Sequence, residues 1–390
     1  MRRMLFLTLA LGVFVAACSG ASVATPTAEP EATATEKPTA TPVPTATATP
    51  SPTPVPVYGP ADYPEGVNPL TGLPVGDPAI LERRPALVKV SNESPEVRPQ
   101  SGLSFADHVW EYQMEGWGQT RFTAVYYGQS PERAGSVRSA RLIDTDVLIP
   151  MYDAILAYSG SSMGMTTELK NTYWERVFRE EPERTHLVRI RDIPVEGTDY
   201  YHALFAVPED LWEYADERGV GEPERRPEGL VFSPDVPPDG EPTDEAIVDF
   251  PGSGPLHRWT YDDASGRWLS STEDQKALAE ETSDIDLLIG EQLAFDNVVV
   301  LYAEHYLADF IEDLPNGLLS VGVILEGEGE AILLRDGQRY EVTWRREGDD
   351  MVQFFDADDQ LIPFRPGTTW FSVTVTGEFE EYQAAVDYKP

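Results

Sequence analysis

Three arginines in the first half of the chain are the residues whose types and spacing best suggest chemistry. Arg121 follows a glycine-containing loop, and Arg138 and Arg141 flank Ser139 in the run Gly135-Ser136-Val137-Arg138-Ser139-Ala140-Arg141. The chain has 29 basic against 67 acidic residues, so a local group of guanidinium side chains needs a reason. Guanidinium groups hold carboxylate or phosphate groups in a planar, two-pronged geometry. The group predicts an anion site, unless its members pair internally with acidic neighbours, namely Asp107, Glu111, Glu115, Asp144 or Asp146.

A glycine- and serine-rich loop adds a second feature of this kind. Gly160-Ser161-Ser162-Met163-Gly164 lies between an expected strand, Ala154–Tyr158, and an expected helix, Thr166–Phe178. Backbone amides at the start of a helix point towards an anion. We therefore expect Gly160, Ser161 and Ser162 to join Ser139 and the three arginines around one ligand.

The same loop also matches the pattern of a serine nucleophile held between a strand and a helix, with Ser162 at its centre. A serine hydrolase needs an acid and a histidine as well. The histidines downstream lie in no recognisable motif, and few strands precede the loop. They are His186, His202, His257 and His305. A nucleophilic Ser162 is therefore the alternative interpretation and not the preferred one.

A pair of glutamates offers another catalytic alternative. Glu111 and Glu115 are four residues apart in Ser104–Glu115, which we expect to be a short helix running into a strand. On a helix they would share a face, as paired carboxylates for glycoside cleavage require. The competing interpretation is that each carboxylate is solvated or matched by an arginine.

No metal site and no cofactor are expected. The five histidines show no paired ligand spacing, and the only cysteine is Cys18. The acidic run Asp356-Ala357-Asp358-Asp359 lacks the glycine and the distal glutamate of a calcium-binding loop, so it predicts a turn.

The first residues predict a membrane anchor. Met1-Arg2-Arg3 precedes an apolar stretch that ends in Val15-Ala16-Ala17-Cys18, the pattern of a bacterial lipoprotein signal peptide over 1–18. Cleavage before Cys18 and transfer of a diacylglycerol to its thiol would place the body on the extracytoplasmic face of the cell membrane. Lipidation uses the single cysteine, so the mature chain has no thiol for a disulfide or a nucleophile.

The overall charge limits the partners. A formal net charge of −38 repels nucleic acid, so no nucleic-acid partner is expected, and it opposes general attraction to anionic lipid headgroups. The expected partners are the membrane itself, through Cys18, and cell-wall glycan or an envelope protein.

Composition divides the chain into five segments. Residues 19–57 are rich in Pro, Thr and Ala, which predicts an extended tether that cannot bury a core. An α+β domain is expected at 58–222 and a mostly β domain at 246–390, with a proline- and acid-rich linker at 223–245. The fold class is therefore α+β, with a mixed N-terminal domain followed by a β-rich one. Asp336-Gly337 between two alternating runs predicts a tight hairpin turn.

Several runs are similar to those of a known family. They are Asn68-Pro69-Leu70-Thr71-Gly72, Arg98-Pro99-Gln100-Ser101-Gly102, the arginine run 135–141, Asp296-Asn297-Val298-Val299-Val300, the glycine run Gly327–Ala331, Asp336-Gly337, Trp344, and Pro366-Gly367 before Trp370. On these motifs the chain resembles the YerB-like family of lipoproteins over nearly the whole body. The resemblance implies two extracytoplasmic domains and a lipid anchor, and it implies no activity. Two loops depart from the family pattern: Gly116-Trp117-Gly118-Gln119 is one residue longer, and Ala203 follows His202 where asparagine is expected.

These observations lead to two functional hypotheses. The first is a non-enzymatic binding or scaffold module of the cell envelope, with an arginine-lined site for an anion or glycan. The alternative is an envelope hydrolase or transferase acting on wall glycan or a phosphate-linked precursor, with Glu111, Glu115 or Ser162 as its catalytic group.

Overall fold

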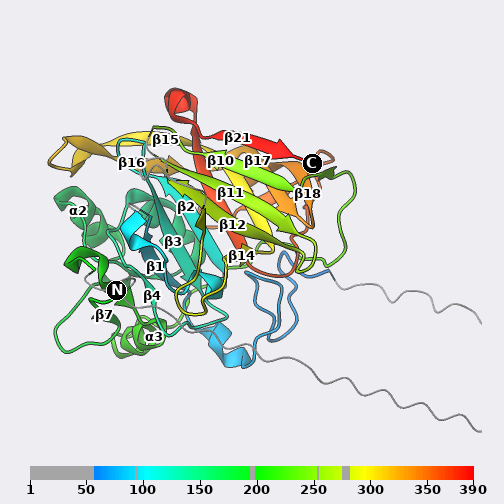
Figure 1. Ribbon diagram of the computed structural model, residues 1–390. Helices are drawn as coiled ribbons and strands as arrows, with labels where there is room; N and C mark the ends of the chain where they lie inside the picture. Colours follow the sequence, from blue (N-terminus) through cyan, green and yellow to red (C-terminus); the bar gives the residue numbers. More distant parts are fainter. Residues whose placement is uncertain (1–56, 93–94, 194–197, 253, 275–281) are drawn as a thin grey trace, which may run out of the picture. The chain divides into compact units, whose positions relative to one another are not determined.

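Strands from both halves of the chain build one large sheet, which positions the candidate site. The computed structural model describes residues 57–92, 95–193, 198–252, 254–274 and 282–390, and Figure 1 shows their arrangement. The predicted signal peptide 1–18 with Cys18, and all but the last residue of the predicted tether 19–57, lie outside these residues.

The N-terminal half contributes five strands to the large sheet. β3 (Thr120–Tyr126) pairs antiparallel with both β1 (Ala86–Ser91) and β2 (His108–Gln113). Two short strands, β5 (Ile155–Ala157) and β6 (Val177–Phe178), continue the sheet in parallel beyond β1. Every residue of these five strands is buried, because both faces of this part of the sheet are covered.

The expectation for Ser104–Glu115 is confirmed for the strand and wrong for the helix. Only Leu103–Phe105 forms a single 3-10 turn, and His108–Gln113 forms β2. β2 is paired on both sides, with β3 and with β20 (Thr369–Thr376). These backbone hydrogen bonds and the burial of both faces outweigh the helical spacing of a few apolar residues.

The C-terminal half completes the same sheet. β20 lies between β2 and β15 (Asn297–Asp313) and runs parallel to both. The strand order is β19-β18-β17-β15-β20-β2-β3-β1-β5-β6, with β16 beside β15 and β9 beside β18. The other strands of this part are β9 (Glu241–Pro242), β16 (Leu318–Ile324), β17 (Gly327–Arg335), β18 (Gln338–Arg346) and β19 (Gln353–Phe355). The predicted N-terminal and C-terminal domains thus share one 12-stranded sheet.

Two smaller sheets flank the large one. The six-stranded sheet contains β10 (Glu245–Asp249), β11 (Pro255–Asp262), β12 (Arg267–Asp274), β13 (Thr282–Ser283), β14 (Ala294–Phe295) and β21 (Ala385–Lys389). The three-stranded sheet contains β4 (Ala134–Gly135), β7 (Leu187–Arg189) and β8 (Leu204–Ala206).

The helices are few and short. They are α1 (Ile149–Tyr152), α2 (Met163–Thr172), α3 (Pro208–Glu217), one π-helical turn (Asp144–Leu148) that leads into α1, and the 3-10 turns Pro78–Glu82, Pro95–Val97, Leu103–Phe105, Trp174–Arg176, Tyr200–His202 and Gly377–Tyr382. With these helices and the three sheets, the predicted α+β fold class is confirmed.

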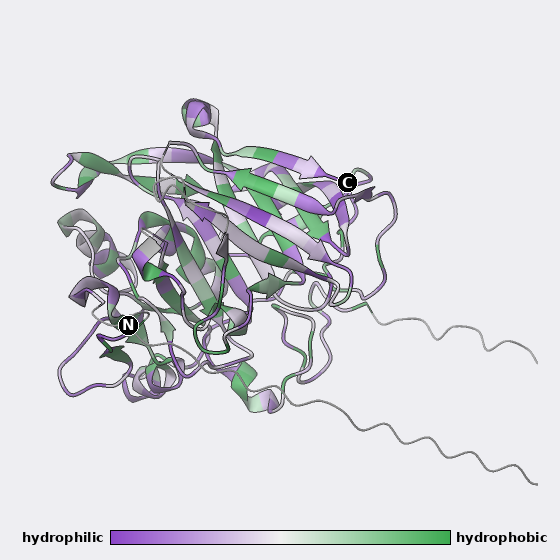
Figure 2. Ribbon diagram, viewed as in Figure 1, coloured by the Kyte–Doolittle hydropathy of each residue, from purple (hydrophilic) through white to green (hydrophobic). Residues whose placement is uncertain are grey.

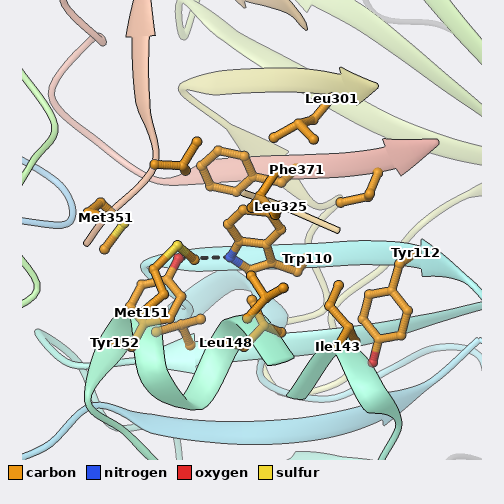
Figure 3. Packing of buried hydrophobic residues seen from close by; sticks show 14 of the residues in the cluster. Trp110, Tyr112, Ile143, Leu148, Met151, Tyr152, Leu301, Leu325, Met351 and Phe371 are labelled. Carbon is orange, nitrogen blue, oxygen red and sulfur yellow. Dashed lines mark hydrogen bonds between the residues drawn. The ribbon is translucent and has the colours of Figure 1, made fainter. Parts of the chain in front are cut away.

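The two faces of the large sheet pack against different layers. On one face Trp110 stacks on Phe371 with ring centroids 4.2 Å apart, and its Nε1 donates a hydrogen bond of 2.8 Å to the Tyr152 hydroxyl of α1 (Figure 3). On the other face Val109 and Trp370 pack with aromatic residues of the six-stranded sheet. Because side chains alternate along β2, neighbouring residues belong to different cores. Figure 2 shows the hydrophobic residues along these strands.

Residues 223–245, expected to link two domains, pack into the body. Phe232 is fully buried, and its backbone bridges to Tyr58 and to Phe364. The guanidinium group of the buried Arg335 donates to the carbonyl oxygens of Ser233 and Asp235, each at 3.1 Å. This segment therefore joins the start of the described body to strands of its C-terminal half.

A long β-hairpin reaches from the large sheet to helix α2. It comprises the distal part of β15 and all of β16, and we call residues 304–324 the β15–β16 arm (Figure 1). Three side chains of β15 attach it: Tyr306 donates to Asp146 at 2.8 Å, Phe310 packs on Gly164 of α2, and Glu312 accepts from Ser162 at 2.8 Å.

The contact between Gly164 and Phe310 gives a test of how this arm is held. A Cβ atom at Gly164 would lie 2.1 Å from the Phe310 ring, so Gly164→Ala must displace the arm. We expect it to lower the free energy of unfolding by about 1–3 kcal/mol, as overpacking does elsewhere. Gly160→Ala is the control, because a Cβ there meets nothing within 4 Å. Urea denaturation of both variants tests this, and equal stability would contradict the contact.

Candidate anion-binding site

Four of the predicted anion-binding residues meet at one pocket of about 570 Å³. Arg121, Arg138, Ser139 and Arg141 all line it, so we call it the arginine pocket. Its other walls come from the turn between β2 and β3 (Met114, Glu115, Gly116, Gly118 and Gln119) and from the tip of the β15–β16 arm (Glu312, Asp313, Leu314, Pro315, Asn316 and Leu318). Segments nearly 200 residues apart in the sequence therefore form a single cavity.

The loop that carries two of the arginines is fixed by backbone hydrogen bonds. The N–H of Arg138 donates to the carbonyl of Lys89 in β1 at 3.0 Å. The N–H of Ser159 donates to the carbonyl of Arg138 at 2.9 Å, and the N–H of Ala140 donates to the carbonyl of Gly160 at 3.0 Å. The arginine run and the glycine–serine loop thus lie against each other, as their sequence suggested.

Arg141 is held by two carboxylates. Its Nε and Nη2 donate to the two oxygens of Glu115 at 2.8 and 2.5 Å, and its Nη1 lies 3.3 Å from Glu312 Oε1. All three side chains are at most 10% exposed. Burial opposes ionisation of Glu115, but Arg141 and Arg121 outweigh it and lower the pKa of this carboxyl group. For Arg141 the interpretation of internal pairing is therefore correct.

Arg121 and Arg138 lie on the same pocket. Arg121 is a buried residue of β3, and its Nη1 donates to the carbonyl of Ser139 at 3.3 Å. Arg138 is half-buried in the lining. With Arg141 they balance the three acidic residues of the lining, Glu115, Glu312 and Asp313. Acidic residues outnumber basic ones by more than two to one in the whole chain, so a lining in which the two signs balance is less negative than the chain as a whole.

A buried ion pair supports the arginine loop from below. Lys89 and Asp144 are both fully buried, and Lys89 Nζ lies 2.8 Å from Asp144 Oδ1 and 2.7 Å from Thr123 Oγ1. The other oxygen of Asp144 accepts the backbone N–H of Arg141 at 2.7 Å. Burial lowers the pKa of Lys89 to about 8, against the attraction of Asp144. The attraction of Asp144 therefore favours the charged form of Lys89, whereas desolvation opposes it.

The glycine–serine loop has the expected strand–loop–helix setting, but Ser162 is engaged as a helix cap. Its Oγ accepts the N–H of Met165 at 3.1 Å at the start of α2 and donates to Glu312 at 2.8 Å. Its backbone is extended, with φ −60° and ψ 171°, and lacks the strain of a nucleophile turn. No histidine is bonded to it in the part of the chain that the structure describes. Gly160, Ser161 and Ser162 support the pocket wall and do not line the cavity.

Glu111 and Glu115 do not share a helix face, so the paired-carboxylate geometry is wrong. Glu115 faces the arginine pocket, whereas Glu111 of β2 is buried on the opposite side of the sheet. There Thr120 donates to Glu111 at 2.8 Å, and His257 Nδ1 of β11 lies 3.2 Å from it. Desolvation raises the pKa of Glu111 to about 8 and lowers that of His257 to about 3, so burial favours the neutral form of both groups.

Sequence reasoning missed Lys89 and Glu312 and did not single out Asp144. Lys89 carried a signal, because a lysine inside the apolar run Ala86–Val90 has to find a buried partner. Asp144 was named only as one of several acidic neighbours. Glu312 had no local signal, since only the folded arm brings it to Arg141 and Ser162.

In the part of the chain that the structure describes, no group of three or more His, Cys, Asp or Glu side chains is arranged to hold a metal ion. The same residues include no helix with the length and apolar character needed to cross a membrane.

Comparison with protein families gives two matches. Residues 70–221 match the N-terminal domain of a family described as "Protein of unknown function (DUF3048)", and residues 247–371 match its C-terminal domain. The arginine loop belongs to the first match and the β15–β16 arm to the second. The arginine pocket is therefore built from both family domains.

Comparison with individual proteins supports the same family. A Bacillus subtilis (strain 168) protein named "Putative lipoprotein YerB" is 28% identical over 317 residues, covering 78% of this chain and 85% of the relative. The crystal structure of YerB protein from Bacillus subtilis matches with a TM-score of 0.65 at 25% identity, covering 82% of this chain and 98% of that one. This chain is thus a homologue of YerB and belongs to the DUF3048 family, with both of its domains.

Proposed function

We propose that this chain is a membrane-anchored, extracytoplasmic lipoprotein whose body binds a phosphate or carboxylate group of an envelope ligand at the arginine pocket. The observation that carries the proposal is the convergence of Arg121, Arg138 and Arg141 on one cavity in a chain of net charge −38. A chain with this net charge repels anions in general, so a cavity lined by three arginines is a favourable place for one.

The anchor rests on the N-terminal sequence and on the relative. Cys18 follows a short apolar stretch with small residues before it, and the Bacillus subtilis homologue carries the name of a lipoprotein. A diacylglycerol on Cys18 would hold the protein on the outer side of the cell membrane. Its ligand would then be an envelope component that bears a phosphate or carboxylate group.

The proposal is for binding without catalysis. It is supported by the engagement of each candidate catalytic group in the fold: Ser162 caps α2, Glu115 pairs with Arg141, and Glu111 lies on the far face of the sheet. None of the three is placed beside another to act as acid, base and nucleophile on one substrate.

Titration calorimetry with glycerol phosphate and with acetate tests the site. Arg138 is half-buried and lines the pocket, so Arg138→Ala removes one guanidinium group from the lining. We expect the variant to bind glycerol phosphate about tenfold more weakly or worse, since a charge-assisted hydrogen bond contributes about 1.5–3 kcal/mol. Arg345→Ala, at an exposed arginine outside the pocket, should bind like the wild type. Equal affinity of the Arg138 variant and the wild type would refute the proposal.

A further inference from the structure

Exposed hydrophobic side chains gather beside the arginine pocket. Among the described residues, twelve large hydrophobic side chains are exposed, and five of them lie on the β15–β16 arm. They are Leu307, Ile311, Leu314, Leu319 and Ile324. A sixth, Met163, begins helix α2 next to Ser162, which is bonded to the arm through Glu312. Figure 2 shows hydrophobic residues along this arm.

Two of these side chains lie at the pocket. Leu314, at the tip of the arm, lines the cavity and is 78% exposed. Met163 is 87% exposed and follows Ser162, which donates to the lining residue Glu312. Ile311 and Leu319 pair across the two strands of the arm and do not line the cavity. We call Met163 and Leu314 the apolar rim.

A charged pocket with an apolar rim has the chemistry of a site for an amphiphile. The arginines are suited to an anionic headgroup, and the rim is suited to the hydrocarbon next to it, because burying such side chains removes apolar surface from water. Resting on the proposed anion site, we propose that the ligand is a phosphate-bearing lipid presented by a bilayer, with the apolar rim inserted at the membrane surface.

The negative charge of the β15–β16 arm favours binding of a single lipid headgroup over general attraction to an anionic membrane. The arm from Glu304 to Ile324 contains four acidic residues and no lysine or arginine. A densely anionic surface would repel it, whereas a zwitterionic bilayer carrying a few phosphate headgroups would not. Contact then depends on insertion of the rim together with capture of one headgroup by the arginines.

The chain outside the described body makes this contact reachable. Residues 19–56 separate the expected lipid on Cys18 from the body, and at ~3.1 Å per residue an extended polyproline-type tether reaches on the order of 100 Å. A segment of this length is long enough for the arm to reach the membrane that holds the chain's own anchor. Tethering also raises the effective concentration of the body at that surface.

Vesicle binding tests the inference with the mature chain, residues 18–390, carrying Cys18→Ser so that its own anchor does not mask the result. The probes are phosphatidylcholine vesicles with and without phosphatidic acid, and free glycerol phosphate. Met163→Ser,Leu314→Ser should lower affinity for the phosphatidic acid vesicles at least tenfold more than affinity for glycerol phosphate. Val236→Ser is the matched control, an exposed apolar residue outside the arm. Arg138→Ala should weaken binding to both probes.

The outcomes separate the two proposals. Equal loss of vesicle and glycerol phosphate binding in the rim variant overturns the lipid inference and leaves the anion site standing. The same holds if the wild type binds glycerol phosphate but no vesicles. Failure of the wild type to bind glycerol phosphate overturns the anion site itself.

Discussion

Lys89→Met is expected to lower the free energy of unfolding by about 3–5 kcal/mol, because removing one partner of a buried ion pair leaves the other charge uncompensated. The partner is Asp144, which is fully buried and whose second oxygen holds the backbone of Arg141. The loss should also loosen the arginine loop and weaken anion binding. Chemical denaturation at neutral pH measures the first effect, and glycerol phosphate titration the second.

Two further variants make this prediction specific. Lys389 is an exposed lysine near the C-terminus that pairs with Glu245. We expect Lys389→Met to lower the free energy of unfolding by less than about 1 kcal/mol. Lys89→Met,Asp144→Asn removes both charges, so it should be more stable than Lys89→Met alone. If Lys89→Met and Lys389→Met lowered the free energy of unfolding equally, the buried ion pair between Lys89 and Asp144 would contribute no more than an exposed one, against the prediction.

Glu111→Gln is expected to stabilise the protein increasingly as pH rises from about 4.5 to 8, by on the order of 3–5 kcal/mol in total. The pKa of Glu111 is about 8 in the fold, against an ordinary value of 4.5. Between these values the unfolded wild type loses a proton that the folded wild type keeps, so stability of the wild type falls as pH rises. Glutamine carries no such proton and escapes this loss.

His257 acts in the opposite direction and in a lower window. Its pKa falls from 6.5 to about 3 in the fold, so the unfolded state gains a proton as pH drops below 6.5 and stability falls there. Both proteins contain His257, so the difference between their unfolding free energies reports Glu111. Urea denaturation of wild type and variant from pH 5 to 9 measures that difference, with the exposed Glu378→Gln as control. A difference that stays constant with pH would contradict the buried, protonated Glu111.

The local parts of the fold were readable from the sequence. Alternation in Thr120–Tyr127 predicts a strand, which the structure shows as β3, and Asp336-Gly337 predicts the β17–β18 hairpin, in which both turn residues have positive φ values of 51° and 67°. β20 was missed, although Thr369–Thr376 is the strand that joins the two halves of the sheet. Its parallel pairing with β2 and β15 is a long-range contact. Parallel strands are not joined by a tight turn, so no local turn sequence predicts the pairing.

The candidate site shows the same limit. The arginine run and the glycine–serine loop were expected to meet because both suit an anionic ligand, and their backbones do lie against each other. The sequence could not predict which of the arginines pairs with an acidic residue of the protein itself. Arg141 pairs with Glu115 and with Glu312, which is 171 residues away and arrives only with the folded arm. Pairing of this kind depends on tertiary structure and leaves no local pattern.

Nuclear magnetic resonance of arginine side chains tests the central claim most directly. In protein labelled with ¹⁵N-arginine, the Nε–Hε signal of Arg138 is identified by its loss in Arg138→Ala. We predict that glycerol phosphate shifts the signals of Arg138 and Arg121, which line the pocket, and leaves the exposed Arg345 unchanged. No shift at Arg138 and Arg121, or a uniform shift of all arginines, would contradict an anion site in the arginine pocket.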